Sequence, residues 1–315
     1  MKAGHYGSAV GMAAGLGTAG LCSDLLITVV LLTLLVMIPS GIFALVSWVL
    51  ISVQLYQHPE LRMFLLGSTT VVVLLVGIAA LLARGRWLRK GGRVGGGERL
   101  FKGFAWWSAL FALSLSALVA GSVIGTGNYN DNFRQYYEVS TLQVYPDVNP
   151  ARTQGQQLLD AGVVTFEMGS ALDVNRSMGF TSKQTYCVAP IIAPSTQALP
   201  AVFDFWAAGT NCCSSGGNDF RCGAYDNSMA RGGLRLMDQD ATNFKLAVQQ
   251  AQVAYHIKSA HPLFFEWVSD PISELNAKKD QGLSVYKRSV CLAVGVTLGI
   301  VSIGFVYFWL SRHTD

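Results

Sequence analysis

Cysteine is the residue type in this chain with the greatest chemical potential, and three of its six copies lie close together. In the stretch "NCCSSGGNDFRC" (211–222), Cys212, Cys213 and Cys222 are surrounded by Gly, Ser and Asn, and Cys187 precedes them. Such a group could bind zinc, exchange electrons or form structural disulfides. Structural zinc sites use CxxC-like knuckles and many redox centres use CxxC, and neither spacing occurs here. We therefore predict two disulfides and no metal site, with Cys187 bonded to one of the vicinal pair and Cys222 to the other.

Other catalytic patterns are absent from the sequence. Neither HExxH nor GxSxG occurs. Asp204 stands in an aromatic stretch and could act as an acid, but a hydrogen-bonded structural aspartate is the commoner case. His256 and His261 flank the end of a predicted helix, where surface positions are expected. The sequence therefore predicts a non-enzymatic protein that uses no cofactor and binds no nucleic acid.

The elements that position these residues are mostly apolar. The chain is 51% hydrophobic and only 13% charged, well below the roughly 25% charged residues of a soluble domain. Four segments are long enough to cross a bilayer, which takes about 20 apolar residues. They are residues 24–56, 63–83, 103–125 and 289–310. Pro39 interrupts the first segment, which we interpret as one kinked helix rather than two spans.

Charge sets the expected orientation. The loop 84–102 holds seven basic residues and one acid, so the positive-inside rule places it on the cytoplasmic side. Its first basic side chains are candidates for topology determinants and for contact with lipid headgroups: Arg84, Arg86, Arg89, Lys90 and Arg93. The expected order is an inner tail (1–23), helices one to three (24–125), an extracytoplasmic domain (126–286), and helix four with a short inner tail (287–315). The predicted location is the plasma membrane or an endomembrane, as a multi-pass protein.

The segment 126–286 has the pattern of a small α+β domain. Residues 163–168, 185–193 and 201–209 are rich in β-forming side chains, and residues 240–260 have a helical apolar face. A short helix is also predicted at 150–162, and an aromatic connector at 261–271. Asn175 begins the sequon "NRS" and is a candidate glycosylation site on the expected outer side. The predicted fold class is therefore a membrane α-helical protein with a disulfide-stapled α+β domain between helices three and four.

Small residues recur within two of the predicted membrane helices. Ser108, Ala112, Ser116 and Ala120 are spaced by four, and Gly295 and Gly299 form GxxxG. Such stripes let helix backbones approach closely, either within the bundle or against a partner's helix. The predicted spans hold no ionisable residue at mid-membrane, which argues against a pump or proton-coupled transporter. Cys22 and Cys291 are expected to be free thiols, and Cys22 could be acylated.

Four spans, inner termini, a large second outer loop and the vicinal cysteines of "CCSSGG" (212–217) resemble the tetraspanin plan. The family motif is Cys-Cys-Gly, and only its cysteines are matched. The resemblance implies that Cys212 and Cys213 are the disulfide hub of the outer loop, and that the protein organises other membrane proteins or mediates adhesion. An accessory subunit of a large membrane complex is the alternative, and an oligomeric channel is a third option. The expected partners are membrane lipids, other membrane proteins and a second copy of the chain.

Overall fold

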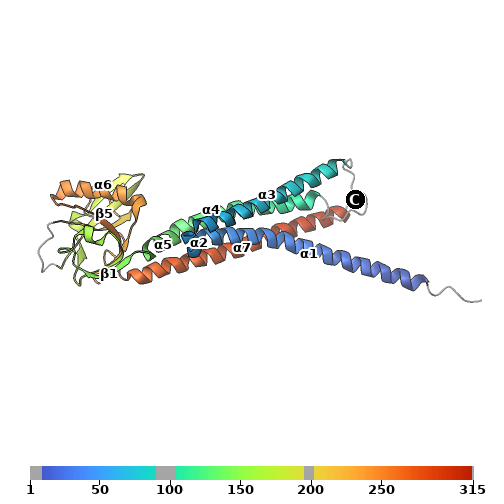
Figure 1. Cartoon of the computed structure of the whole chain (residues 1–315), viewed down its shortest axis with the longest axis horizontal. Coiled ribbons are helices and arrows are strands. Elements are labelled where there is room, and N and C mark those ends of the chain that lie inside the picture. The colour runs from blue at the N-terminus through green and yellow to red at the C-terminus, as the bar shows by residue number, and fades with distance from the viewer. Residues whose placement is uncertain (1–8, 90–103, 195–201, 314–315) are drawn as a thin grey trace, which may run out of the picture. The chain divides into compact units, whose positions relative to one another are not determined.

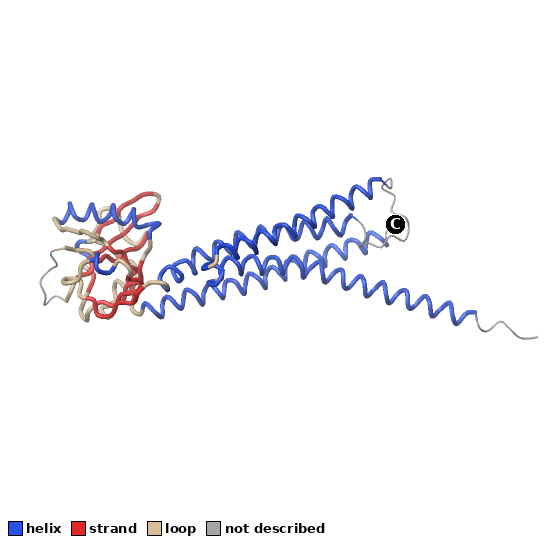
Figure 2. The backbone as a smooth tube through the Cα atoms, in the orientation of Figure 1, coloured by secondary structure: helices blue, strands red, loops and turns tan. Residues whose placement is uncertain are grey.

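The computed structural model describes residues 9–89, 104–194 and 202–313, and these form two compact units. One unit, called here the helical unit, comprises residues 1–129 and 284–315. The other, the sheet domain, comprises residues 130–283. Figure 1 shows the long helices of the first unit, and Figure 2 shows that the strands gather in the second.

Four helices are long and apolar enough to span a membrane. A helix satisfies all its backbone hydrogen bonds internally, which is the requirement of a lipid environment. The described helices of this unit, including a short one between the first two spans, are α1 (Ala9–Ile51), α2 (Val53–Gln57), α3 (Pro59–Arg89), α4 (Phe104–Asn128) and the later part of α7 (Pro271–His313). As predicted, α1 continues through Pro39 as one helix.

The helices extend beyond the apolar segments that predicted them. Helix α1 begins at Ala9, α3 begins at Pro59 in its favoured first position, and α7 begins at Pro271 rather than near 287. Hydropathy identifies only the part of a helix that suits lipid. The polar residues of "SELNAKKDQG" (273–282) are mostly good helix formers, so α7 starts well before its apolar part.

Helix α4 packs against α1 along a row of small residues that differs from the predicted one. A Cβ atom added at Gly121 would lie 3.2 Å from the Phe43 carbonyl oxygen, and one at Gly125 would lie 2.9 Å from Leu50 Cδ1. The Ser47 hydroxyl donates to the Gly121 carbonyl at 3.3 Å. "GSVIG" (121–125) is thus the GxxxG sequence at a helix contact.

The small residues singled out from the sequence lie elsewhere. Ala112 and Ser116 are exposed, and Ser108 and Ala120 are half-buried. A Cβ atom at Gly295 or Gly299 would meet no described residue within 4 Å. Contact of these two glycines with another helix, whether in this chain or in a partner, therefore stays a prediction. For α4 the difference is rotational: a four-residue repeat of small residues occurs on several faces of the helix, and only packing selects one.

The sheet domain contains an eight-stranded mixed sheet. Its strands are β1 (Gln143–Val148), β2 (Ala161–Phe166), β3 (Ala171–Leu172), β4 (Met178–Ser182), β5 (Gln184–Ile192), β6 (Phe205–Thr210), β7 (Gly232–Arg235) and β8 (Leu263–Val268). The order is β1-β2-β7-β8-β6-β5-β3, and β4 also pairs with β5. The pairs β1/β2 and β6/β8 are parallel, and the others are antiparallel.

Alternating side chains give this sheet two apolar faces. In β5, Cys187, Ala189 and Ile191 belong to one core cluster, whereas Tyr186 and Val188 belong to another. Helix α6 (Asp238–Tyr255) covers the second face with Phe244, Ala247, Val248 and Ala251. Helix α5 (Arg134–Ser140) and the start of α7 cover the same face further along, through a cluster of Val139, Val163, Leu234, Val268 and Leu275. The first face is covered instead by the loop that carries the disulfides, with Phe220, Cys222 and Ala230.

The predicted α+β character is confirmed, with corrections in detail. The strands predicted at 163–168, 185–193 and 201–209 correspond to β2, β5 and β6, and the helix at 240–260 corresponds to α6. The predicted helix at 150–162 is a 3₁₀ turn at Gly155–Leu158; a second such turn lies at Val174–Arg176. The connector predicted at 261–271 contains β8, a central strand. Its flanking prolines lie outside the strand and cost it no ladder hydrogen bond.

Candidate functional site

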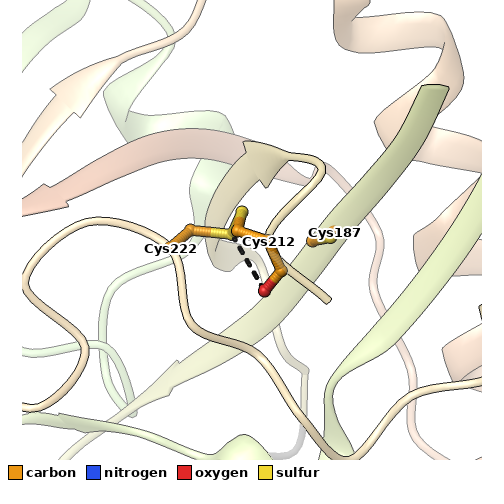
Figure 3. Close-up of side chains that lie close together, drawn as sticks. All are labelled: Cys187, Cys212 and Cys222. Carbon is orange, nitrogen blue, oxygen red and sulfur yellow. Dashed lines mark hydrogen bonds between the residues drawn. A yellow bond between two sulfur atoms is a disulfide. The ribbon is translucent and has the colours of Figure 1, made fainter. Parts of the chain in front are cut away.

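The four cysteines of the sheet domain form two disulfides, which settles the open pairing. Cys187 bonds to Cys213, and Cys212 bonds to Cys222, with Cα–Cα distances of 5.8 and 5.2 Å. Figure 3 shows Cys212 and Cys222 joined, with Cys187 nearby on β5. The sulfur atoms of Cys187, Cys212 and Cys222 lie within 4.8 Å of one another. Because each sulfur is already bonded to a second sulfur, this cluster is a double staple rather than a metal site.

Glycines make room for this double staple on the sheet. Cys187 is paired with Gly179 on β4 and with Gly209 on β6, so one sheet row reads Gly–Cys–Gly. A Cβ atom at Gly179 would lie 2.9 Å from Cys213 Sγ, and one at Gly209 would lie 2.8 Å from Cys222 Sγ. Both disulfides therefore lie over sheet positions that are occupied by glycine and carry no side chain.

A cleft of about 510 Å³ opens beside the second disulfide. Cys212, Arg221 and Cys222 form one wall, α5 forms another, and the start of α6 with Phe244 forms a third. The floor holds Ala208 and Gly209 of β6 and Glu266 of β8. Strands β6 and β8 are parallel, so the cleft lies toward their carboxyl ends, between the two helices that cover this face. Elements distant in sequence thus build one concave site.

Glu266 is a charged residue of β8 that lines this cleft. It lies on the same apolar face of β8 as buried Phe264 and Val268. A carboxylate on such a face requires hydrogen-bond or ionic partners. Lys278 of α7 donates to it at 2.6 Å, and Gln135 of α5 donates at 3.1 Å. Lys278 also donates to Gln135 Oε1 at 2.7 Å. These three side chains connect both flanking helices to the sheet.

Three further charged residues, Arg134, Glu138 and Arg221, lie on the walls. Arg134 pairs with Glu138 at 2.9 Å one turn along α5. Across the cleft, Arg221 is exposed beside the loop carboxylate of Asp219. The hydroxyl and backbone N–H of Ser214 hydrogen-bond to Asp219, and these bonds, with the Arg221 charge, hold the pKa of that carboxyl below its ordinary value. The lining therefore presents fixed charges of both signs.

Asp204 is a possible acid by sequence, but in the structure its role is structural. It is 3% exposed, and its carboxylate accepts backbone N–H groups of Gly155, Ala260 and His261 at 2.9–3.0 Å. A carboxylate that accepts three amide hydrogen bonds fixes the chain before β8 against β6. His256 and His261 are exposed, as predicted.

The remaining predicted site residues are scattered. Asn175 is exposed in the second 3₁₀ turn. Arg84, Arg86 and Arg89 lie on the last turns of α3, and the Arg84 guanidinium lies 5.9 Å from the ring centroid of Phe104. Lys90 and Arg93 lie outside the described residues, as does the side chain of Cys22. Cys291 is an exposed free thiol on α7.

Sequence reasoning missed the cleft and its central side chains Gln135, Glu266 and Lys278. One signal was available: in "LFFEWV" (263–268), the glutamate shares strand parity with Phe264 and Val268, which is unusual for a solvent-facing residue. Gln135 and Lys278 give no local signal, because their meeting depends on two helices that flank a domain of some 150 residues.

The described cleft lining shows no hydroxyl or free thiol activated by a neighbouring base, and three of its charged side chains, Arg134, Glu138 and Glu266, are held in ion pairs. Such a lining can bind polar groups of a ligand without further reorganisation. In comparisons with known proteins, no family, no curated sequence and no solved structure matches the chain.

Proposed function

We propose that this protein is a multi-pass membrane protein that binds a partner protein through the cleft of its sheet domain, on the extracytoplasmic side. The role is that of an organiser or adhesion protein with a plan like that of tetraspanins. The observation that carries this proposal is the cleft itself, which is lined by residues of α5, α6, β6, β8 and the disulfide loop.

The internal contacts of the cleft support a binding role. Gln135 and Lys278 hydrogen-bond to Glu266, and Arg134 forms an ion pair with Glu138. Because these side chains are already ordered, they lose little conformational entropy when a partner binds. The double staple fixes the opposite wall. Preorganised polar groups around an apolar patch such as Leu236 and Phe244 suit a polypeptide segment that carries both charged and apolar side chains.

The proposed sidedness rests on two features. Two disulfides persist in oxidising, extracytoplasmic compartments. The last turns of α3 carry the basic residues Arg84, Arg86 and Arg89. These residues favour the cytoplasmic side for the ends of the spans that do not connect to the sheet domain.

A charge reversal in the cleft tests the proposal. Full-length wild type and the variant Arg221→Glu would be crosslinked in native membranes, and recovered partners quantified by mass spectrometry. We expect Arg221→Glu to lose a set of partners that the wild type recovers, because a wall cation becomes an anion next to Asp219. Arg152→Glu, an exposed arginine that does not line the cleft, is the matched control and should keep the same partners. Equal recovery with Arg221→Glu and wild type would refute the proposal.

A second candidate function is supported by α7. Among the described residues, Gly295 and Gly299 have no neighbour within 4 Å of an added Cβ atom, so this face can accept a helix of another membrane protein. In this alternative the chain is an accessory subunit of a larger complex. Purification in fixed ratio with other subunits, and release by Gly299→Leu with the chain itself still folded, would favour it over the organiser role.

A further inference from the structure

Helix α7 contacts the rest of the helical unit at two positions along its length, near Tyr286 and near Val301. At the first, the Tyr286 hydroxyl donates to the Ala44 carbonyl of α1 at 3.3 Å, and its ring lies 5.6 Å from that of Trp48. At the second, Val301 is buried in a cluster with Leu35, Val36 and Leu110. Between and beyond these contacts the helix is poorly covered: only 6% of its most apolar window is buried.

Two adjoining apolar cavities lie between α1, α4 and α7. One, of about 460 Å³, lies along Ser289–Ile300 of α7 and includes Pro39 and Ser116 in its wall. The other, of about 400 Å³, continues along α7 to Phe305 and includes Trp106 and Ala112. They share Leu113 and Ile300, so together they form one slot along the bundle.

We propose that this slot binds one hydrocarbon chain of an ester-linked membrane lipid. The wall of the larger cavity extends over Ser289–Ile300, roughly 16 Å of helix, which gives a mean cross-section of roughly 30 Å². An α-helix about 10 Å wide requires roughly 80 Å². An extended chain of carbons in van der Waals contact with its surroundings requires only roughly 15–20 Å². The dimensions therefore suit a lipid chain better than an inserted helix. This inference rests on the membrane insertion in the proposed function, but not on partner binding by the cleft.

The position of Trp106 places the polar end of the lipid. Trp106 is half-buried in the first turn of α4, the level at which tryptophan meets lipid headgroups. Among the described residues its indole N–H has no hydrogen-bond partner. The ester carbonyls of a glycerolipid lie at this level and accept hydrogen bonds. The lipid would thus enter with its ester beside Trp106 and its chain directed along Leu113 toward Pro39.

Ser40 provides a test of this direction. Its side chain is 7% exposed in the wall of the larger cavity, and its hydroxyl also has no partner among the described residues. It lies near the middle of the span Leu26–Ile51, where an acyl chain carries only carbon and hydrogen. An acyl chain gains nothing from Ser40, whereas a ligand with an oxygen at mid-membrane would.

The experiment uses the full chain in phosphatidylcholine nanodiscs with a diacyl phosphatidylcholine that carries a diazirine midway along one chain. We expect photolabelling of peptides that line the slot on α4 and α7. Ala112→Phe and Ser116→Phe, both at exposed positions that fill the slot, should reduce that labelling about tenfold. Val119→Phe, an exposed position on the same helix outside the slot, is the matched control and should leave it unchanged.

The hydrogen bond is tested separately. A dialkyl ether analogue with the same diazirine should label about fivefold less, the value of one hydrogen bond, and Trp106→Phe should abolish that difference. Ser40→Ala should have no effect. Labelling spread evenly around α4, no effect of either filling variant, loss of labelling with Ser40→Ala, or displacement of the probe by added sterol would each overturn the proposal.

Discussion

Cys222 and Cys291 show how the same residue type acquires different roles in one chain. Cys222 is buried and bonded to Cys212, whereas Cys291 is an exposed thiol on the long apolar helix α7. Cys222→Ser should lower the free energy of unfolding of the sheet domain by roughly 3 kcal/mol, the chain entropy of the opened loop. Cys291→Ser should leave it unchanged. Denaturant unfolding of both variants measures the difference, and non-reducing peptide mapping should recover Cys187–Cys213 and Cys212–Cys222 from the wild type. A Cys187–Cys222 peptide would contradict the structure.

Asp204 acts through the backbone groups that it binds. Asp204→Ala leaves the buried N–H groups of Gly155, Ala260 and His261 without an acceptor, and we expect a loss of roughly 3 kcal/mol in the free energy of unfolding. Asp226→Ala removes an exposed carboxylate and is the control. Thermal or chemical unfolding of the two variants compares them. Equal stability would show that water can replace Asp204.

Asp219 gives a pH-dependent prediction at the rim of the cleft. Hydrogen bonds from the Ser214 side chain and backbone, together with the nearby Arg221, lower its pKa from the ordinary value of 3.8. Because the folded pKa is the lower one, its stabilising contribution is present above 3.8 and disappears as the pH falls through the folded pKa. Ser214→Ala should move the pKa back toward 3.8, which carboxyl NMR titration can detect. An unchanged titration would contradict the hydrogen bonds.

At the scale of elements, the α1–α4 contact depends on two glycines. Gly125→Leu would drive a side chain into Ser47 and Leu50, and overpacking of this kind costs roughly 1–3 kcal/mol. Gly299→Leu is the matched control, since nothing lies within 4 Å of its added Cβ atom. Thermal melting in detergent should show destabilisation by the first change alone. If Gly299→Leu destabilises the isolated chain as strongly, α7 packs differently from the arrangement described here.

At the scale of the whole molecule, the central prediction is sidedness. A protease added outside intact cells or right-side-out vesicles should cut within 126–286 and spare the basic stretch 84–102, because its seven basic residues favour the cytoplasmic side. A tag inserted after Arg93 should be accessible only after permeabilisation. Cleavage at 84–102 in intact cells would show that the orientation is the reverse of the proposed one. The disulfides would then no longer support an extracytoplasmic location of the cleft.

The sequence by itself determined what depends on local composition. Long apolar segments predicted four helices long enough to span a membrane, Pro39 was correctly placed inside one helix, and stretches rich in β-forming side chains predicted β2, β5 and β6. The spacing of the cysteines limited the disulfides without choosing between Cys187–Cys212 and Cys187–Cys213. These features could be predicted because their causes, transfer to lipid and side-chain periodicity, act over a few residues to a few turns.

The tertiary structure decided whatever requires residues distant in the chain to meet. Gly179 and Gly209 lie beside Cys187 only after three strands pair, and that row makes room for the double staple. Gln135 and Lys278 reach Glu266 only because α5 and α7 pack on one face of the sheet. The contact face of α4 was likewise selected by the shape of α1, since several small-residue repeats on one helix are equivalent until a neighbour packs against one of them.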